Sequence, residues 1–220
     1  MKNLIIVLFI GLILASCSTS QVTKSKRYER MYDEKPLAIL VMPPINRSTE
    51  VEAKEFFYSS LIVPITLKGY YVLPPLLSME ILKEESAYDA ELFINSPMQQ
   101  VGSLFGVDAV LFTTIHEWSK VALLSQITVT VEYTLKSTKT NEILFNRKGQ
   151  ITYSPNASGN NLLANMVSNI LITAFTKEIE IGRKCSVFTL GDMPAGKYDP
   201  KWGADGDLKS GEPEFKVKLQ

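Results

Sequence analysis

The sequence predicts an α/β fold: a single domain with a mixed β-sheet, helices packed on it, and an irregular C-terminal tail. A continuous apolar run at residues 37–42 is typical of a strand buried on both faces. Residues 126–136 alternate between apolar and polar, as in a strand with one wet face. Apolar side chains recur at helical spacing from 53 to 65. The early strand–helix alternation favours parallel pairing and the later hairpin favours antiparallel pairing, so we expect a mixed sheet.

The first predicted helix follows the apolar strand and covers Thr49–Lys68. Thr49 and Glu52 have the spacing of a capping box at its start. Gly69 follows as the C′ residue that ends it. Pro64 lies inside this helix and removes one backbone hydrogen bond, so we predict a kink there.

The middle of the chain is predicted to alternate short and long elements. We expect a strand at 70–73, a helix at 76–85, a helix capped by Ser96 that ends before Gly106, and a strand at 107–118. The alternating strand 126–136 and the segment 142–153 are separated by a turn-like stretch, so they should pair as a hairpin.

The C-terminal third is predicted to contain one helix and a tail. Two adjacent apolar rows at four-residue spacing indicate a helix that begins near Ser158 and packs on the sheet. From Gly182 onward, glycines and prolines punctuate the sequence, which predicts an extended wrap or a mobile tail. Residues 208–220 are charged and are expected to fray.

The N-terminus carries a lipoprotein signal. Lys2 precedes a 12-residue apolar run from Leu4 to Ala15, and Leu14-Ala15-Ser16-Cys17 then matches a bacterial lipobox. A membrane-spanning helix needs about 20 residues, whereas a signal peptide needs roughly 7–15 apolar residues. A transmembrane anchor or an ordinary secretory signal would not require the cysteine. We therefore predict lipidation of Cys17.

The predicted organisation has four parts: residues 1–16 form the signal peptide, 17–35 a lipidated flexible tether, 36–181 the α/β lipoprotein domain, and 182–220 an extended C-terminal tail. Several acyl chains on one cysteine anchor a protein stably to a membrane. Ser18 follows Cys17, without an aspartate that would retain the protein at the inner membrane. We expect an outer-membrane protein that faces the periplasm.

Composition excludes some functions. Lys and Arg number 23, as do Asp and Glu, so the chain lacks the basic excess typical of nucleic-acid-binding proteins. Once Cys17 is lipidated, Cys185 is the remaining cysteine. We expect it to be a small, partly buried apolar residue, with an intermolecular disulfide as the alternative.

The sequence offers little catalytic chemistry. His116 is the single histidine, so a catalytic triad or a zinc site has few residues to draw on. Asp192, Asp199, Asp205 and Asp207 do not have EF-hand spacing and are expected to be solvated. The adjacent pair Glu84-Glu85 points in diverging directions on a helix. We therefore predict a protein that is not an enzyme and has no catalytic, cofactor or metal site.

Several short segments resemble a known family. They are Pro43-Pro44-Ile45-Asn46-Arg47-Ser48, Phe57-Tyr58-Ser59-Ser60, Pro64-Ile65 and Lys68-Gly69-Tyr70-Tyr71-Val72-Leu73-Pro74. Together they resemble a bacterial lipoprotein family of unknown function that includes the neisserial GNA-type antigens, over about residues 36–200. The resemblance implies a lipid-anchored envelope protein whose body is similar to the N-terminal domain of TolB. It also implies a link to CsgG-like lipoproteins of curli secretion, and it brings no catalytic residues.

These observations favour a non-enzymatic envelope lipoprotein that assists an assembly or curli-like secretion system. Its partners would be the membrane, through the lipid at Cys17, and either envelope proteins or a second copy. We expect the hairpin with the Thr-rich strand 126–136 to make that contact through an uncovered sheet face or edge, rather than through a deep pocket. The alternative is that the Thr-rich face simply meets water. One alternative is a ligand- or peptidoglycan-binding protein with Tyr58, Tyr70 and Tyr71 at its pocket. Another is a periplasmic hydrolase that uses His116 or carboxylates, which substitutions of His116 and Glu117 would test.

Overall fold

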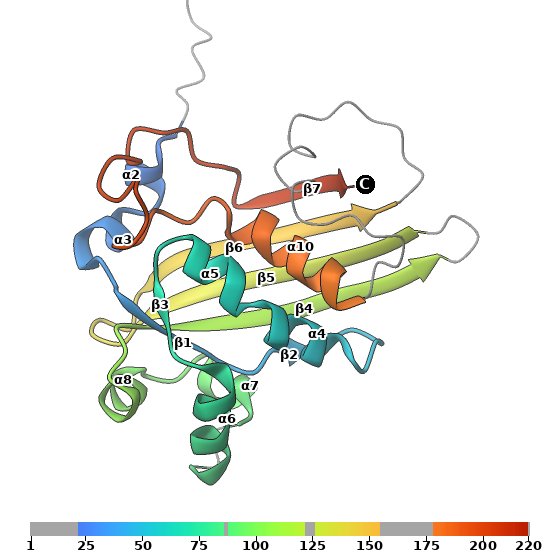
Figure 1. The fold of residues 1–220 in the computed structure, drawn as a ribbon, viewed down its shortest axis with the longest axis horizontal. Coiled ribbons are helices and arrows are strands. Elements are labelled where there is room, and N and C mark those ends of the chain that lie inside the picture. Colours follow the sequence, from blue (N-terminus) through green and yellow to red (C-terminus); the bar gives the residue numbers. More distant parts are fainter. Residues whose placement is uncertain (1–21, 86–87, 122–125, 155–177, 220) are drawn as a thin grey trace, which may run out of the picture.

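The fold is built on one mixed sheet of seven strands (Figure 1). The computed structural model describes residues 22–85, 88–121, 126–154 and 178–219. The strands are β1 (Ala38–Val41), β2 (Ile45–Asn46), β3 (Tyr71–Val72), β4 (Ala109–Val121), β5 (Gln126–Ser137), β6 (Ile143–Tyr153) and β7 (Glu214–Leu219). They follow the order β3-β1-β4-β5-β6-β7, and β2 also pairs with β4. The β4-β5-β6 pairs are antiparallel and the others are parallel, which confirms the predicted mixed sheet.

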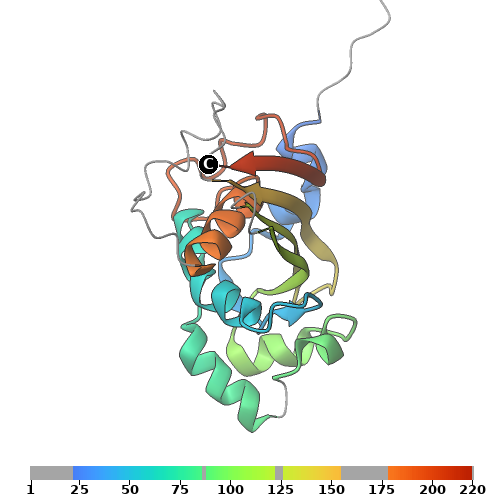
Figure 2. The ribbon, with the colours of Figure 1, turned by 90° about the vertical axis from the view of Figure 1, so that its right-hand side faces the viewer.

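Helices cover the two faces of the sheet unequally. They are α2 (Lys24–Arg27), α3 (Glu29–Glu34), α4 (Ala53–Ser60), α5 (Ile62–Leu67), α6 (Pro75–Glu84), α7 (Ala90–Phe93), α8 (Gln99–Phe105) and α10 (Glu178–Leu190). Figure 2 shows α4, α5 and α10 (teal and orange) on one side of the sheet, and α6 to α8 (green) gathered below it. The second group therefore reaches only one end of the sheet.

The strand β1 lies between two hydrophobic cores. Ile39 and Val41 pack into the larger core, which continues along β4, β5 and β6 to α4, α5 and α10. Leu40 and Met42 point to the smaller core, which α6 to α8 complete. A strand buried on both faces needs apolar residues at successive positions. This explains the continuous apolar run at 37–42.

The helix predicted over Thr49–Lys68 differs at its start and in its middle. The capping box was wrong, because α4 begins at Ala53 and its N-cap residue Glu52 makes no side-chain cap bond. The preceding residues form a local turn in which Asn46 accepts a hydrogen bond from the Ser48 amide at 3.0 Å. Short polar side chains compete in this way with helical capping.

The kink predicted at Pro64 is confirmed as an interruption of the helix. The helix stops at Ser60 and resumes at Ile62 as α5, four and two residues before the proline. Pro64 has no N–H to donate to the carbonyl of Ser60, and its ring crowds that carbonyl. Gly69 and Gly106 both adopt positive φ, at 80° and 65°, just after their helices. Their predicted roles as helix terminators are therefore confirmed.

The segment predicted to be an N-terminal tether is folded from Lys24 onward. From Lys24 the chain forms α2 and α3, and Tyr28 and Met31 contribute to the larger core. Thr23 forms an isolated β-bridge with Lys209, near the other end of the chain. The prediction of a flexible segment up to residue 35 was therefore wrong from Lys24 onward. The charged side chains of this segment are typical of a solvated linker, but the segment folds against residues that are distant in the sequence.

The C-terminal segment is only partly irregular. Gly182 lies inside α10, where a Cβ atom would approach the Phe56 carbonyl oxygen to 3.2 Å, so this glycine permits close packing of α10 on α4. The irregular stretch is 191–213, and residues 214–219 form β7 instead of fraying. The helix predicted to begin near Ser158 lies outside the described residues. Within the described ranges, no helix combines the length and apolarity required to cross a bilayer.

Candidate functional sites

The first candidate site is the side of β4 to β6 that the α6–α8 group leaves uncovered, which we call the polar sheet face. Its residues are His116, Glu117, Thr128, Thr130, Glu132, Asn146, Gln150 and Thr152. They hydrogen-bond to one another across the strands: Thr128 to Thr152 at 3.2 Å, and Thr130 to Glu117 at 3.0 Å. Because the side chains hold each other in place, the face presents a fixed polar pattern to solvent.

A β-bulge brings His116 and Glu117 onto this face together. The register between β4 and β5 shifts between Ile115 and Glu117, so one residue has no partner of its own. His116 Nε2 then lies 2.9 Å from a Glu132 carboxylate oxygen, and Glu117 accepts a hydrogen bond from Thr130. Consecutive residues of a regular strand would point to opposite faces. The pattern of apolar and polar residues in the sequence did not predict that His116 and Glu117 lie on the same face.

The His116–Glu132 pair has no nucleophilic side chain bonded to it among the described residues. Asn146 donates to the second oxygen of Glu132 at 2.9 Å. Burial raises the pKa of Glu132, but hydrogen bonds from Asn146 and His116 outweigh it and hold the pKa below its usual value. Glu132 thus remains an acceptor for both neighbours. A nucleophile within hydrogen-bond reach of the imidazole is needed for covalent catalysis, and none is found in the described part of the chain.

The three tyrosines expected at a ligand pocket do not converge. Tyr58 donates its hydroxyl proton to the Pro75 carbonyl at 2.8 Å, and Tyr70 donates to the Pro194 carbonyl at 2.9 Å. Both side chains are buried, whereas Tyr71 is exposed. Neighbouring strand residues face opposite ways, so Tyr70 and Tyr71 diverge. Tyr58 and Tyr70 thus belong to the core and Tyr71 to its exposed rim, which is the simpler interpretation of these aromatic residues, and they do not form a common pocket.

The second candidate site is a cleft where the two ends of the chain meet. It has a volume of about 730 Å³, a size typical of small-molecule sites. Pro64, Leu67, Val187 and Phe188 supply its apolar lining. Its charged lining residues are the cations Lys24, Lys68, Arg147 and Lys209 and the single acid Asp192. This cleft could not be predicted from sequence patterns, because its residues come from five separate stretches of the chain.

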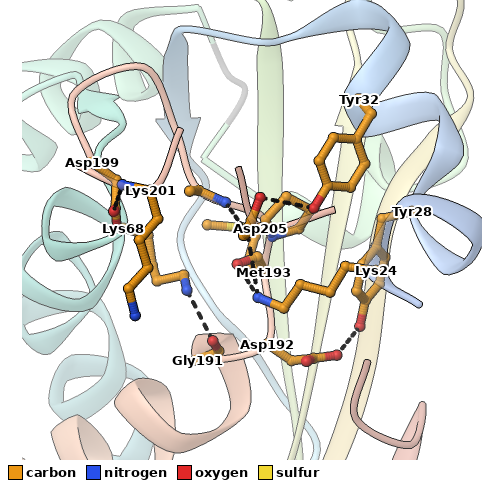
Figure 3. A network of polar contacts seen from close by, with 12 residues as sticks. Lys24, Tyr28, Tyr32, Lys68, Gly191, Asp192, Met193, Asp199, Lys201 and Asp205 are labelled. Carbon is orange, nitrogen blue, oxygen red and sulfur yellow. Dashed lines mark hydrogen bonds and ion pairs between the residues drawn. The ribbon is translucent and has the colours of Figure 1, made fainter. Parts of the chain in front are cut away.

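A buried ion pair fixes the N-terminal helix beside the cleft (Figure 3). Lys24 Nζ lies 3.5 Å from a carboxylate oxygen of Asp205, and their exposed fractions are 7% and 2%. Asp205 also accepts hydrogen bonds from the Tyr32 hydroxyl and the Ala195 amide, both at 2.9 Å. The prediction that this aspartate is solvated was wrong. A carboxylate removed from water needs such partners.

The other three tail aspartates differ in their surroundings. Asp192 accepts a hydrogen bond from the Tyr28 hydroxyl at 2.5 Å, so it too is not simply solvated. Asp199 is half-buried and caps a turn by accepting from the Lys201 amide at 2.8 Å, while Asp207 is exposed as predicted. Burial, aided by the Asp192 bond, raises the pKa of Tyr28. The phenol therefore stays protonated and remains a donor.

The cleft environment lowers the pKa of the Lys68 ammonium group. Its Nζ donates to the Gly191 carbonyl at 2.9 Å. Burial, together with the nearby charge of Lys24, lowers the pKa of Lys68 to about 8. A lysine shifted in this way is still largely charged at pH 7, and it loses its charge at a much lower pH than a solvated lysine.

Cys185 and the acidic residues do not form a metal centre. Cys185 is completely buried in the larger core, as expected of a small apolar residue, and burial raises its pKa to about 12. Such a thiol is unreactive. Glu84 and Glu85 are exposed at the end of α6. Across the described ranges, no three His, Cys, Asp or Glu side chains are grouped so that they could hold a metal ion.

Comparison with known proteins assigns the chain to a family. Residues 26–187 match the family described as "Putative lipoprotein GNA1162-like". The chain belongs to this family. The resemblance stated from the sequence is thereby confirmed, and the GNA1162-like protein is a lipoprotein on this assignment. The matched region contains every helix and strand except α2's first residues, the end of α10, and β7.

Two neisserial proteins support the same assignment, and a structure from another organism shows only a weak likeness. The GNA1162-like chain is 30% identical to the lipoprotein NMB1124/NMB1162 of Neisseria meningitidis serogroup B, over 78% of this chain and 80% of that protein. The crystal structure of lipoprotein GNA1162 from Neisseria meningitidis matches with a TM-score of 0.52 and 30% identity, covering 61% of this chain and 95% of that one. A PelC dodecamer structure from Paraburkholderia phytofirmans matches with a TM-score of 0.41 and 10% identity, over 71% of this chain and 86% of that one.

Proposed function

We propose that this GNA1162-like protein is a non-enzymatic lipoprotein, anchored to the periplasmic side of the outer membrane by Cys17, that assists an envelope assembly or curli-like secretion system. The observation that carries the proposal is the polar sheet face. It is broad, internally hydrogen-bonded and uncovered by any helix in the described part of the chain. Such a face suits docking to a protein surface of complementary polarity better than it suits catalysis.

The contact would be made by the face of the hairpin and not by its edge. The strand β5 pairs with β4 on one side and β6 on the other, so its backbone groups are already used. No edge of this strand is therefore available for pairing with a partner. Lipid anchoring supports docking through the face, because confinement to one membrane raises the effective concentration of both partners. Envelope proteins such as CsgG-like lipoproteins, or a second copy, are the proposed partners.

The polar sheet face can be tested by adding charge to it. Thr130 is not suitable for this substitution, because its side chain is buried and donates a hydrogen bond to Glu117. Thr128 and Gln150 are half-buried and lie diagonally across β5 and β6, so Thr128→Arg with Gln150→Arg can extend both side chains into water. We expect this variant to fold and to lose its oligomer or its cross-linked partners in membranes.

A charge-matched control separates docking from a general effect of charge. Glu84→Gln with Glu85→Gln changes the net charge by the same amount at the exposed end of α6. The control should retain both the oligomer size, measured in detergent by ultracentrifugation, and the cross-linking pattern. If the face variant behaves like the control, the polar sheet face is not the contact surface.

The lipid anchor is tested at its attachment point. Cys17→Ser should leave an uncleaved precursor without acyl chains, because the thiol is the acceptor of the lipid. Metabolic labelling with a fatty acid and gel mobility would measure both effects. Ser18→Ala changes a neighbouring residue and should be processed normally. Labelled, fully cleaved Cys17→Ser protein would contradict the proposal.

A further inference from the structure

The cleft between the chain ends combines an apolar wall with an excess of positive charge. Leu67 is 65% exposed although it is apolar, and Pro64, Val187 and Phe188 lie on the same cleft. Lys24 is paired with Asp205, and the other three lining cations still exceed the one lining carboxylate, Asp192. A cleft of this kind matches a ligand with an apolar part and an anionic part.

The positive charge is only partly neutralised by the protein. The guanidinium of Arg147 is buried and donates to the carbonyls of Phe188, Thr189 and Glu212 at 3.0–3.2 Å. Lys68 also donates to a carbonyl, that of Gly191. No carboxylate forms an ion pair with Arg147, Lys68 or Lys209 within the described residues. A buried charge such as that of Arg147 is usually paired, so an external anion would stabilise it.

The cleft also lies next to the start of the described chain. The Val22 carbonyl accepts hydrogen bonds from both the amide and the hydroxyl of Ser210, and Ser210 lines the cleft. Cys17 is five residues upstream of Val22. Five extended residues span at most about 17 Å. If Cys17 carries the lipid, as the proposed function requires, the cleft is held within that distance of the bilayer surface.

We propose that this cleft binds an anionic phospholipid of the membrane that anchors the protein. The lipid phosphate would lie among Lys68, Lys209 and Arg147, and an acyl chain would lie along Leu67 and Phe188. The membrane supplies this ligand at high local concentration, and the cleft offers both of the chemistries that the ligand presents. Binding would hold the body of the protein against the membrane in one orientation.

The binding should depend on pH through Lys68. The groups that face its ammonium are Lys24, Asp192, Asp199, Asp205 and the Gly191 carbonyl. As the pH rises through about 8, Lys68 loses its proton and one charge that faces the phosphate disappears. We therefore expect binding to weaken over that range, and we expect Lys68→Gln to bind more weakly with a flatter pH profile.

The test uses the mature chain, residues 17–220, with Cys17→Ser, so that the lipid anchor does not contribute to binding. Co-sedimentation is measured with vesicles of phosphatidylcholine alone and of phosphatidylcholine mixed equally with phosphatidylglycerol. We expect binding to the anionic vesicles only. A lysine near an anionic membrane contributes about fivefold to affinity, so Lys68→Gln with Lys209→Gln should bind roughly 25-fold more weakly.

Controls distinguish the cleft from a general attraction of charge. Lys197→Gln with Lys201→Gln removes two exposed lysines that do not line the cleft and should change affinity much less. A phosphatidylglycerol with a photoactivatable acyl chain should cross-link near residues 64–67 and 187–188, and Leu67→Asp should reduce that cross-linking. Equal losses in the two lysine pairs, cross-links elsewhere, or equally tight binding of inorganic phosphate alone would overturn the proposal.

Discussion

Asp205→Ala is expected to lower the free energy of unfolding by about 3–5 kcal/mol, because it leaves the buried Lys24 ammonium without its counter-ion. The same change removes the acceptor for the Tyr32 hydroxyl and the Ala195 amide. Urea denaturation monitored by circular dichroism would measure the loss. Asp207→Ala, two residues away and exposed, should stay within about 0.5 kcal/mol of the wild type.

A second variant tests the cause of this loss. In a Lys24→Met background, Asp205→Ala leaves no unpaired cation, so the further loss should be smaller than in the wild type. If Asp205→Ala costs the same in both backgrounds, the ion pair does not fix α2, and the hydrogen bonds to Tyr32 and Ala195 account for the effect. A loss below about 1 kcal/mol in the wild type would show that the pair contributes little.

Gly69→Ala is expected to destabilise the fold by about 2–5 kcal/mol. Gly69 has a φ of 80°, where an L-residue costs about 1–2 kcal/mol. Its Cβ would also lie 2.8 Å from the Gly196 carbonyl oxygen, and closer still to the Asp199 amide nitrogen. Overpacking against backbone adds about 1–3 kcal/mol. The loop 196–199 is bound here, through the Gly196 amide on the Lys68 carbonyl and the Tyr198 amide on the Gly69 carbonyl.

Gly106→Ala provides the matched control for this effect. Gly106 also follows a helix with positive φ, at 65°, but a Cβ there would have open space around it. It should therefore show the cost of backbone strain alone, and thermal unfolding of both variants would give the difference. Equal destabilisation of the two variants would mean that the close contact between Gly69 and the loop 196–199 does not contribute to the effect.

Local patterns predicted much of the fold. The apolar run at 37–42, the alternation at 126–136, Pro64 and the glycines 69 and 106 each depend on near neighbours, and each is confirmed. The alternation Glu214-Phe215-Lys216-Val217-Lys218-Leu219 was also visible in the sequence. It would have predicted β7 if the charges had not been read as a frayed end.

The candidate sites were harder to predict, because they join residues that are distant in the sequence. Lys24 and Asp205 are 181 positions apart, and each taken alone is typical of a solvated charged residue. The cleft forms where the same N-terminal and C-terminal segments lie side by side. The adjacency of His116 and Glu117 on one face depends on a bulge, which shifts the register without a marker in the sequence.

The contacts between the ends also constrain the order in which the protein can mature. The Lys24 amide bonds to the Leu208 carbonyl and the Ser25 amide to the Gly206 carbonyl, so α2 is held by residues that are synthesised among the last. Contacts of such high sequence separation form late and slowly in folding. The helix α2 can therefore become ordered only after nearly the whole chain has been synthesised.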